Sequence, residues 1–380
     1  MIYQDFQGMK LSMLGFGTMR LPVLPDGEID VPQTKEMTKW AIDHGVNYFD
    51  TAMPYHGGKS EIVMGQVLKD YPRDSYYLAT KYPGHQISSS YDPKGTFETQ
   101  LKKCDVDYFD FYLLHNVYEN SIQVYKDPKW GILDYFKEQR ANGRIRHLGF
   151  STHARPDTLR AFLEYCREIG LTMEFCQIQL NYLDWTLQDA KKKCEILNEF
   201  GIPIWVMEPI RGGRLADDVK STLRFLMDIP GVTVVLSGMS SMAQMQENTE
   251  IFDHMDPLSE EERAALLLKA EGMKNSLPCT ACRYCCDGCP MGLDIPMLIA
   301  AYNDLKFGAS NTPLMQMDAL SEDKLPSACI GCGACAAICP QKIDIPAAMA
   351  ELADIYAKSP KWADICRERE EAARRLAEGK

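Results

Sequence analysis

The stretch NYFDTAMPYHGGKSEIVMGQVLKDY (residues 47–71) decides the fold of this chain. It opens with a short apolar run typical of a strand, passes through a loop containing two glycines, and ends in a segment whose apolar residues have helical spacing. A strand, a loop and a helix in this order form one β/α unit. A chain that repeats the unit builds a parallel sheet covered by helices.

Seven further strand-like runs lie between residues 13 and 237: MLGFGTM, YYLATK, FDFYLLH, IRHLGFS, FCQIQL, IPIWVM and VTVVLS. Amphipathic segments such as QTKEMTKWAIDHG and DTLRAFLEYCREIG lie between them and end in Gly, as helices often do. Eight such units predict an α/β fold of the (β/α)8 TIM barrel type. A doubly wound open sheet is the alternative, but no GxGxxG follows the first strand.

The C-terminal part carries a different pattern, an internal repeat of cysteines. CTACRYCCDGCPMGLDIP from Cys279 and CIGCGACAAICPQKIDIP from Cys329 align without a gap, 50 residues apart. Each copy contains C-x2-C-x2-C-x3-C-P, the run that holds 4Fe–4S clusters in bacterial ferredoxins. Structural zinc usually takes separated C-x2-C pairs, and disulfides are rare in reducing compartments. We therefore predict two 4Fe–4S clusters.

In two-cluster ferredoxins the fourth cysteine of each run ligates the other cluster. One predicted ligand set is therefore Cys279, Cys282, Cys285 and Cys339, and the other is Cys329, Cys332, Cys335 and Cys289. Cys286 aligns with Ala336, so we predict that it is not a ligand. The remaining cysteines are expected to be ordinary packing residues: Cys104, Cys166, Cys176, Cys194 and Cys366.

These patterns divide the chain into a barrel (1–256), a linker helix (257–277), a mainly helical, ferredoxin-like 4Fe–4S dicluster domain (278–358) and a charged, solvated C-terminal helix (359–380). A polar start and the lack of a long apolar run predict a cytoplasmic protein. The net charge of −12 argues against nucleic-acid or anionic-membrane partners.

Polar, titratable residues stand where three successive strands of the barrel end. Asp50 ends the second strand and Tyr55 follows it, Lys81 ends the third, and His115 ends the fourth. Catalytic residues of such barrels lie at the carboxyl ends of strands, so these four should meet at one mouth. A lysine beside a tyrosine favours the phenolate, and an aspartate keeps the lysine charged. The set suits protonation of a carbonyl oxygen while hydride arrives at its carbon.

The sequence resembles the aldo-keto reductase family between about Gly15 and Asn248. The resemblance rests on GFGTMRLP, NYFDTAMPYHGGKSE, LATK, YLLH, GFS, QIQLNY and SGMSSMAQMQEN. It implies a barrel that binds a nicotinamide without a Rossmann domain, with Tyr55 as general acid, Lys81 and Asp50 as the partners that tune its pKa, and His115 orienting the substrate carbonyl. Together with the cysteine repeat, the whole chain resembles the iron–sulfur subfamily with a C-terminal dicluster domain.

The resemblance also implies cofactor contacts. Residues of this chain that match family contacts to the nicotinamide, the cofactor loop and the adenine are Thr18, Ser151, Gln179, Glu247 and Asn248. At four positions this chain departs from the residue that is usual in the family. Thr152 stands in place of Asn, Met207 in place of a Tyr that stacks on the nicotinamide, and Gly238 and Gln244 in place of basic residues that bind the 2′-phosphate. Because neither of the last two is cationic, the choice between NADPH and NADH stays open.

Arg211 and Arg214 in RGGRL are alternative phosphate contacts, since paired glycines allow close approach of the backbone. The competing interpretation is a glycine-rich turn with two exposed arginines. The loops expected to bind the small carbonyl substrate are SSSYDPKG and ENSIQVYKDPKWG. Their sequences do not indicate which substrate it is.

Nicotinamides transfer two electrons as a hydride, whereas each cluster transfers one, so direct exchange needs a flavin or another converter. Three interpretations therefore remain. The first is a carbonyl reductase coupled through its clusters to a ferredoxin or flavoprotein partner. The second is a flavin- or ferredoxin-dependent redox enzyme whose barrel does not use nicotinamide hydride. The third is an electron-transfer subunit with a non-catalytic barrel.

Overall fold

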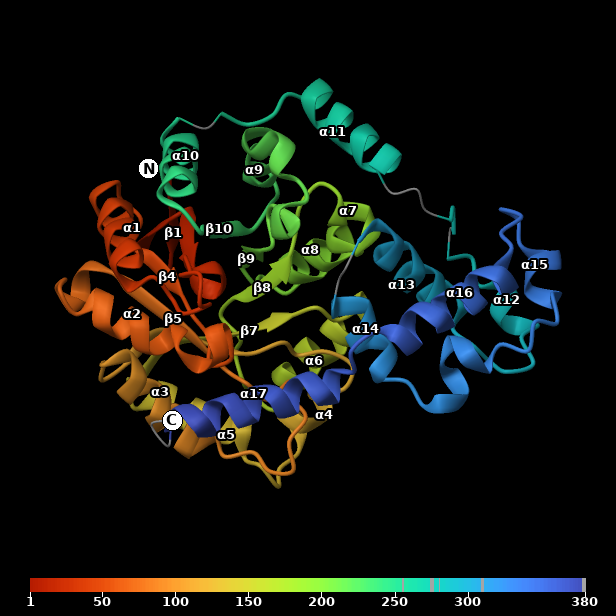
Figure 1. Cartoon of the computed structure of the whole chain (residues 1–380), viewed down its shortest axis with the longest axis horizontal. Coiled ribbons are helices and arrows are strands. Elements are labelled where there is room, and N and C mark those ends of the chain that lie inside the picture. Colours follow the sequence, from red (N-terminus) through yellow and green to blue (C-terminus); the bar gives the residue numbers. More distant parts are fainter. Residues whose placement is uncertain (255, 274–276, 280, 309–310, 378–380) are drawn as a thin grey trace.

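The computed structural model describes residues 1–254, 256–273, 277–279, 281–308 and 311–377. Eight parallel strands close into a barrel in the order β10-β3-β4-β5-β6-β7-β8-β9 (Figure 1). The strands are β3 (Leu14–Gly17), β4 (Tyr48–Asp50), β5 (Tyr77–Tyr82), β6 (Phe109–Leu114), β7 (Ile145–Thr152), β8 (Cys176–Gln179), β9 (Ile204–Met207) and β10 (Val232–Gly238). All eight predicted strands and the barrel are confirmed, and the open-sheet alternative is wrong.

Helices cover the outside of the barrel, and the sequence explains where two of them begin. Asp30 and Asp92 accept hydrogen bonds from the backbone N–H groups of Gln33 and Gly95 at 2.9 and 2.8 Å. Each cap is reinforced by a proline in the first helical turn. The barrel helices are α1 (Val31–Asp43), α2 (Ser60–Leu68), α3 (Pro93–Cys104), α4 (Ser121–Lys126), α5 (Ile132–Ala141), α6 (Pro156–Glu168), α7 (Asp184–Leu187), α8 (Ala190–Glu199), α9 (Val219–Met227) and α10 (Met242–Asp253).

The chain begins with a hairpin that the sequence analysis did not predict, β1 (Tyr3–Phe6) paired with β2 (Met9–Ser12). Its turn residues Gln7 and Gly8 have φ of 52° and 83°, as a two-residue hairpin turn requires. Phe6 packs among the aromatic residues inside the barrel. Because β2 leads directly into β3, the hairpin closes the end where the strands begin, and the site must lie at the other end.

The second domain keeps the internal repeat in three dimensions. Its helices are α12 (Tyr284–Asp287), α13 (Ile295–Phe307), α14 (Asn311–Asp318), α15 (Ala334–Ile338) and α16 (Ile345–Lys358). α12 and α15 begin 50 residues apart, as do α13 and α16, whose caps Asp294 and Asp344 accept hydrogen bonds from the N–H groups of Met297 and Ala347. The helices share an apolar core of their own. The predicted helical dicluster domain is therefore confirmed as a fold.

The predicted linker 257–277 contains α11 (Glu260–Met273), and its residues 274–276 lie outside the described ones. α11 runs along the outside of the molecule between the barrel and the second domain (Figure 1). Across the described residues, no helix is both long and apolar enough to cross a membrane.

The C-terminal segment corrects one prediction. α17 (Trp362–Ala377) is a helix within the expected segment 359–380, whose last three residues lie outside the described ones, but it is not solvated. Trp362 is 4% exposed and Cys366 is 0% exposed, because these residues form a buried stripe at helical spacing. The helix crosses back from the second domain and packs on η2 (Tyr55–Gly58) at the barrel mouth (Figure 1).

Candidate active site and cluster sites

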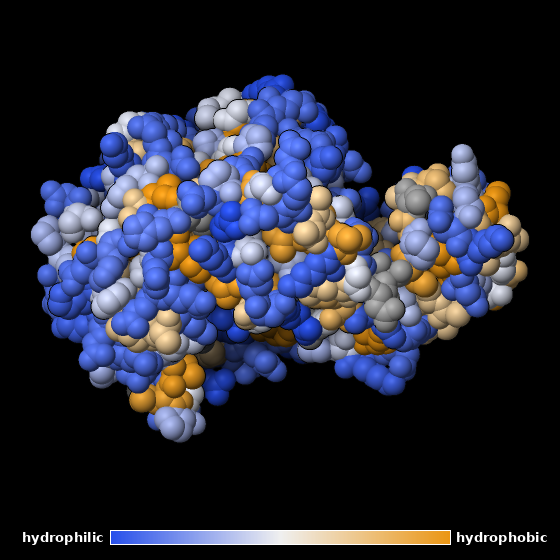
Figure 2. All heavy atoms as spheres, turned by 90° about the horizontal axis from the view of Figure 1, so that it is seen from above, coloured by the Kyte–Doolittle hydropathy of each residue, from blue (hydrophilic) through white to orange (hydrophobic). Residues whose placement is uncertain are grey.

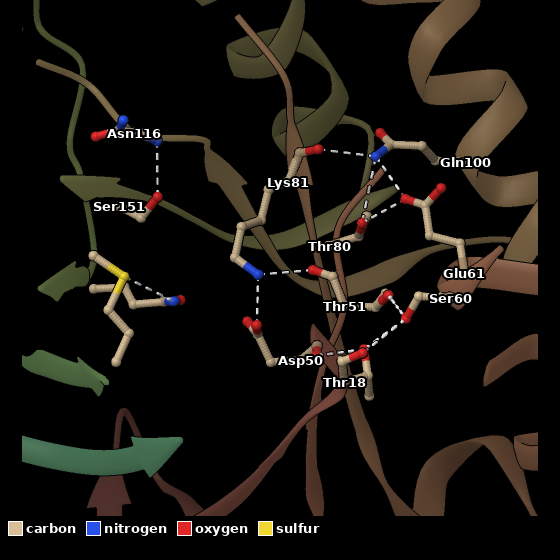
Figure 3. A network of polar contacts seen from close by, with 12 residues as sticks. Thr18, Asp50, Thr51, Ser60, Glu61, Thr80, Lys81, Gln100, Asn116 and Ser151 are labelled. Atoms are coloured by element: carbon tan, nitrogen blue, oxygen red, sulfur yellow. Dashed lines mark hydrogen bonds and ion pairs between the residues drawn. The ribbon is translucent and has the colours of Figure 1, made fainter. Parts of the chain in front are cut away.

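The four predicted catalytic residues meet at the barrel mouth. Lys81 Nζ donates hydrogen bonds to Asp50 Oδ1 at 2.5 Å and to the backbone carbonyl of Thr51 at 2.7 Å (Figure 3). The ring centroid of Tyr55 lies 4.9 Å from Lys81 Nζ and 6.1 Å from the ring of His115. Lys81 and Asp50 are almost fully buried, so their charges meet little competition from water.

The electrostatics of this group assign protonation states. Burial lowers the pKa of Lys81, but Asp50 and Tyr55 outweigh burial and raise it above its usual value. Burial raises the pKa of Tyr55, and the Lys81 charge opposes part of that rise. Burial, helped by His85 and Lys81, lowers the pKa of His115 well below its usual value. At neutral pH the lysine is therefore charged, the phenol is protonated and the imidazole is neutral.

The loop after β4 turns Tyr55 into the mouth. His56, Gly57 and Gly58 all have positive φ, from 51° to 92°, which the two glycines adopt at little cost. The next helix is tied to the barrel by Ser60, whose hydroxyl lies 2.8 Å from that of Thr18 (Figure 3). The sequence PYHGGKS thus fixes both ends of the loop that carries the tyrosine.

A buried glutamate, Glu61, supports β5 from behind. Its carboxylate accepts hydrogen bonds from Thr80, Gln100 and Lys103 at 2.7, 2.8 and 3.0 Å. Gln100 also donates to the backbone carbonyl of Lys81 at 2.9 Å (Figure 3). The network fixes the backbone that carries the lysine. Glu61 was not predicted to have a role, although a carboxylate inside an apolar helical segment was a signal in the sequence.

A second histidine, His85, lies beside His115 and was missed from the sequence. The two ring centroids are 4.2 Å apart, and both Nδ1 atoms are buried without a hydrogen-bond partner in the described part of the chain. Burial lowers the pKa of His85 to about 3, with a further contribution from Arg369. Its place four residues after Lys81, in the loop that follows β5, was the only signal.

Residues predicted to hold the nicotinamide carboxamide lie on β7 and β8. Ser151 Oγ accepts a hydrogen bond from the backbone N–H of Asn116 at 2.8 Å (Figure 3). Gln179 Nε2 donates to Asp184 at 2.8 Å. Met207, which stands where the family commonly stacks a tyrosine, is half-buried at the end of β9. These side chains thus occupy the part of the mouth next to the catalytic strands.

Other predicted cofactor residues have partners within the barrel. Thr18 donates to the backbone carbonyl at the end of β4 at 2.9 Å, and Thr152 donates to the carbonyl of the loop after β6 at 2.6 Å. Asn248 Nδ2 donates to Ser237 Oγ at 2.8 Å, whereas Glu247 is exposed. Except for Glu247, these side chains shape the rim of the mouth through contacts with the strands.

The structure corrects the interpretation of the RGGRL turn. Arg211 is buried and forms ion pairs with Asp184, at 3.2 Å, and with Asp304 of α13. Arg214 donates a hydrogen bond to the carbonyl of Phe307 at 3.4 Å. Both arginines therefore contact the second domain, a role that neither interpretation of this turn considered. The sequence could not reveal their partners, which lie about 90 residues further along the chain.

A cation near the predicted phosphate positions comes instead from Arg20, in η1 (Thr18–Arg20). A methyl group placed on Gly238 would lie 3.3 Å from Arg20 Cβ, and one on Gly212 would lie 3.2 Å from its guanidinium. Arg20 is exposed between these glycine positions, so a phosphate can approach backbone and guanidinium together. Arg20 was not among the residues predicted from the sequence, although it directly follows GFGTM.

Each predicted cysteine set lines one hollow of the second domain. One hollow is lined by Cys279, Cys282, Cys285 and Cys339, and the other is lined by Cys289, Cys329, Cys332 and Cys335. Cys286 lines neither hollow. Among the described residues, no three His, Cys, Asp or Glu side chains converge to hold a single metal ion. Four thiols spaced around a hollow, with apolar walls, fit a 4Fe–4S cluster in each.

Comparisons with known proteins agree with both domains. The sequence model of the Aldo/keto reductase family matches residues 13–221, and that of the 4Fe-4S dicluster domain matches residues 278–343. The chain is 28% identical over 215 residues to a probable aldo-keto reductase 1 of Glycine max, covering 54% of this chain and 58% of that protein's length. It is 24% identical over 228 residues to the NADH-specific methylglyoxal reductase of Escherichia coli, covering 55% and 67%.

Among solved structures, the holo form of an aldo-keto reductase from Bacillus halodurans superposes with a TM-score of 0.57 at 24% identity. The match covers 70% of this chain and 95% of that one. At this identity the likeness concerns the fold, and it supports the barrel.

Proposed function

Because the chain belongs to the aldo/keto reductase family, we propose that it is an oxidoreductase that reduces the carbonyl group of a small substrate. Tyr55 donates the proton, and a nicotinamide supplies the hydride. The two 4Fe–4S clusters feed or drain single electrons through a flavin or another redox partner that converts between one- and two-electron transfer. The observation that carries this proposal is the buried pair of Lys81 and Asp50 beneath Tyr55, with Nζ 2.5 Å from the carboxylate and 4.9 Å from the tyrosine ring.

The proton step follows from these contacts. Tyr55 is protonated at rest because burial raises the pKa of its phenol. When the substrate oxygen takes the proton, the Lys81 charge stabilises the phenolate that remains, and Asp50 keeps that charge in place. His115 is neutral and therefore offers its ring N–H to the carbonyl oxygen without competing as an acid.

The nicotinamide fits the rim described above. A bound nicotinamide supplies a hydride to the carbonyl carbon. Ser151 and Gln179 would hold its carboxamide, and Arg20 with the glycines of the RGGRL turn would meet its phosphates. Because Arg211 forms ion pairs with two carboxylates, Arg20 would be the arginine that binds the 2′-phosphate of NADPH and so selects between NADPH and NADH. The NADH-specific relative from E. coli makes NADH the cofactor to test first.

The clusters would be held by the two sets of four cysteines, and each cluster supplies single electrons when bound. Cys282 and Cys332 are exposed, and around them Tyr284, Ile330 and Ile338 are each more than half exposed. The smaller lobe in Figure 2 shows apolar surface of this kind. We propose this face as the docking site of a ferredoxin or flavoprotein.

On the side of the second domain that faces the barrel, Asp294 forms ion pairs with both Arg283 and Arg155. Arg283 lines one cysteine hollow and Arg155 follows β7, so these ion pairs join the hollow to the barrel mouth.

A flavin- or ferredoxin-dependent barrel is the second candidate, favoured by the engagement of Arg211 and by Met207 in place of a stacking tyrosine. Anaerobic purification separates the two. A flavin band would support the second candidate, whereas reduction of an aldehyde by NADH or NADPH without flavin supports the first. In that assay Tyr55→Phe should lower kcat roughly 10²–10⁴-fold. Unchanged turnover in Tyr55→Phe across several aldehydes would falsify the proton-donor role.

A further inference from the structure

α17 follows the cluster domain in the sequence and packs on the barrel mouth. Trp362 Nε1 donates a hydrogen bond to the backbone carbonyl of His85 at 3.3 Å, and the backbone N–H of Ile87 lies 3.4 Å from Cys366 Sγ. Near its other end, Leu376 packs within 3.5 Å of where a side chain at Gly58 would lie. The helix therefore contacts the loops after β4 and β5, which carry Tyr55 and His85.

Arg369 lies on the buried side of this helix. Its guanidinium stacks 5.0 Å above the ring of Trp362, whose own ring lies 5.7 Å from that of His85. The Arg369 charge is close enough to Tyr55 to lower the pKa of the phenol, although burial and the nearer Lys81 have larger effects. Burial lowers the pKa of the Arg369 guanidinium itself, against the opposing influence of Cys366 and Tyr55.

Arg369 has no acidic partner in the part of the chain that the structure describes. Among the described residues, no carboxylate lies within 4 Å of its guanidinium, whereas two other arginines of α17 are paired, Arg367 with Asp364 and Arg374 with Glu370. A cation that is removed from water without a counter-ion lowers stability, so such sites are usually completed by a bound anion. The neighbouring groups, Trp362 and two neutral histidines, do not provide one.

The charge balance of the mouth sets the kind of anion. Lys81 is neutralised by Asp50, whereas Arg369, above the ring of Trp362, has no ion-pair partner among the described residues. A single positive charge matches a monoanion. The planar guanidinium fork matches the two oxygens of a carboxylate.

We propose that α17 completes the substrate site and that Arg369 binds the carboxylate of a small oxo-carboxylic acid whose carbonyl group faces Tyr55. This inference rests on the proposed carbonyl reduction and adds the substrate class to it. Arg369 then acts in specificity, because it touches a part of the substrate that does not react. The aldo-keto reductase sequence motifs do not reach this helix, so they could not indicate it.

The test compares an acid with its neutral ester on the anaerobically purified holoenzyme. 4-Carboxybenzaldehyde and methyl 4-formylbenzoate differ in one charge. Arg369→Gln should raise KM for the acid roughly 30-fold or more, as loss of a desolvated charge pair does. KM for the ester should change far less, so the preference of the enzyme for the acid over the ester should fall. Arg369→Lys should retain part of the preference, and Arg367→Gln, the same substitution on the exposed side of α17, should behave like the wild type.

Two results would overturn the inference while the proposed function stands. One is an acid-to-ester preference that does not depend on Arg369. The other is an equal fall of kcat for both substrates with a shifted pH profile, because Arg369 would then act only on the pKa of Tyr55. Thermal unfolding and iron content of Arg369→Gln, compared with Arg367→Gln, separate these results from misfolding.

A binding measurement separates this inference from the carbonyl reduction itself. Benzoate and benzamide have the same shape and differ in charge, and calorimetric titration needs no turnover. If the wild type binds benzoate and Arg369→Gln does not, the anion site is supported even if no aldehyde is reduced. Equal benzoate affinity in the wild type and Arg369→Gln overturns it, whatever the reductase assay gives.

Discussion

The barrel mouth and the cluster domain build their sites in different ways. In the cluster domain three of the four cysteines that line each hollow lie within seven consecutive residues, and the fourth comes from the other copy of the repeat. In the mouth the candidate catalytic residues come from positions 50 to 115, and Arg369 comes from near the end of the chain. One site follows from local spacing, and the other exists only after the barrel has closed.

The two sites also depend on different forces. The cysteine hollows need donor atoms at the right spacing, and their geometry is carried by short helices and glycine turns. The mouth needs buried charges that compensate one another, Lys81 with Asp50. Removing a donor should therefore remove one cluster, whereas removing a charge should disturb both the stability and the chemistry of the barrel.

The largest effect is expected for Lys81→Met. Asp50 would be left buried without its cation, which should lower the free energy of unfolding of the barrel by about 3–5 kcal/mol. Loss of the charge beside Tyr55 should lower the reductase kcat roughly 10²–10⁴-fold. Urea unfolding and steady-state kinetics measure these changes.

Adding Asp50→Asn to Lys81→Met should restore stability but not turnover. Lys35→Met, at an exposed ion pair, is the control, and iron loss in Lys81→Met would contradict the independence of the two sites.

Next in size is Cys339→Ser, which removes one ligand from the hollow of Cys279, Cys282 and Cys285. Iron content should fall from about eight to about four per chain, since one of two 4Fe–4S clusters is lost. Cys286→Ser is the matched control, because Cys286 lines neither hollow, and it should keep the iron of the wild type. Loss of iron in Cys286→Ser, or none in Cys339→Ser, would break the predicted ligand assignment.

A smaller effect is expected in the pH dependence of stability. His85 has a pKa of about 3 in the folded chain because of burial, against about 6.5 when unfolded. As pH falls below about 6.5 the unfolded state takes up the proton first, so His85 should lower the free energy of unfolding by about 1.4 kcal/mol per pH unit. His85→Gln should reduce this slope in urea titrations between about pH 6 and pH 5. An unchanged slope would show that His85 is not held neutral.

Much of the architecture could be predicted because its signals are local. Eight apolar runs with helical segments between them predicted the barrel, and the rule that parallel strands place their carboxyl ends together brought Asp50, Lys81 and His115 to one mouth. The β1–β2 hairpin was missed because YQDF and MKLS carry few apolar residues. His85 and Arg20 were missed because each stands alone in a loop, where spacing carries no information.

The sequence by itself determined the two domains, the cluster ligands that we predict and the residue types at the barrel mouth. Those features follow from periodicity and spacing, which act between residues close in the chain. Only the tertiary structure decided that Arg211 contacts the cluster domain and that α17 packs on η2 at the barrel mouth. These contacts join residues far apart in sequence. A highly charged helix is predicted to be exposed to solvent unless the surface that packs against its few apolar residues is known.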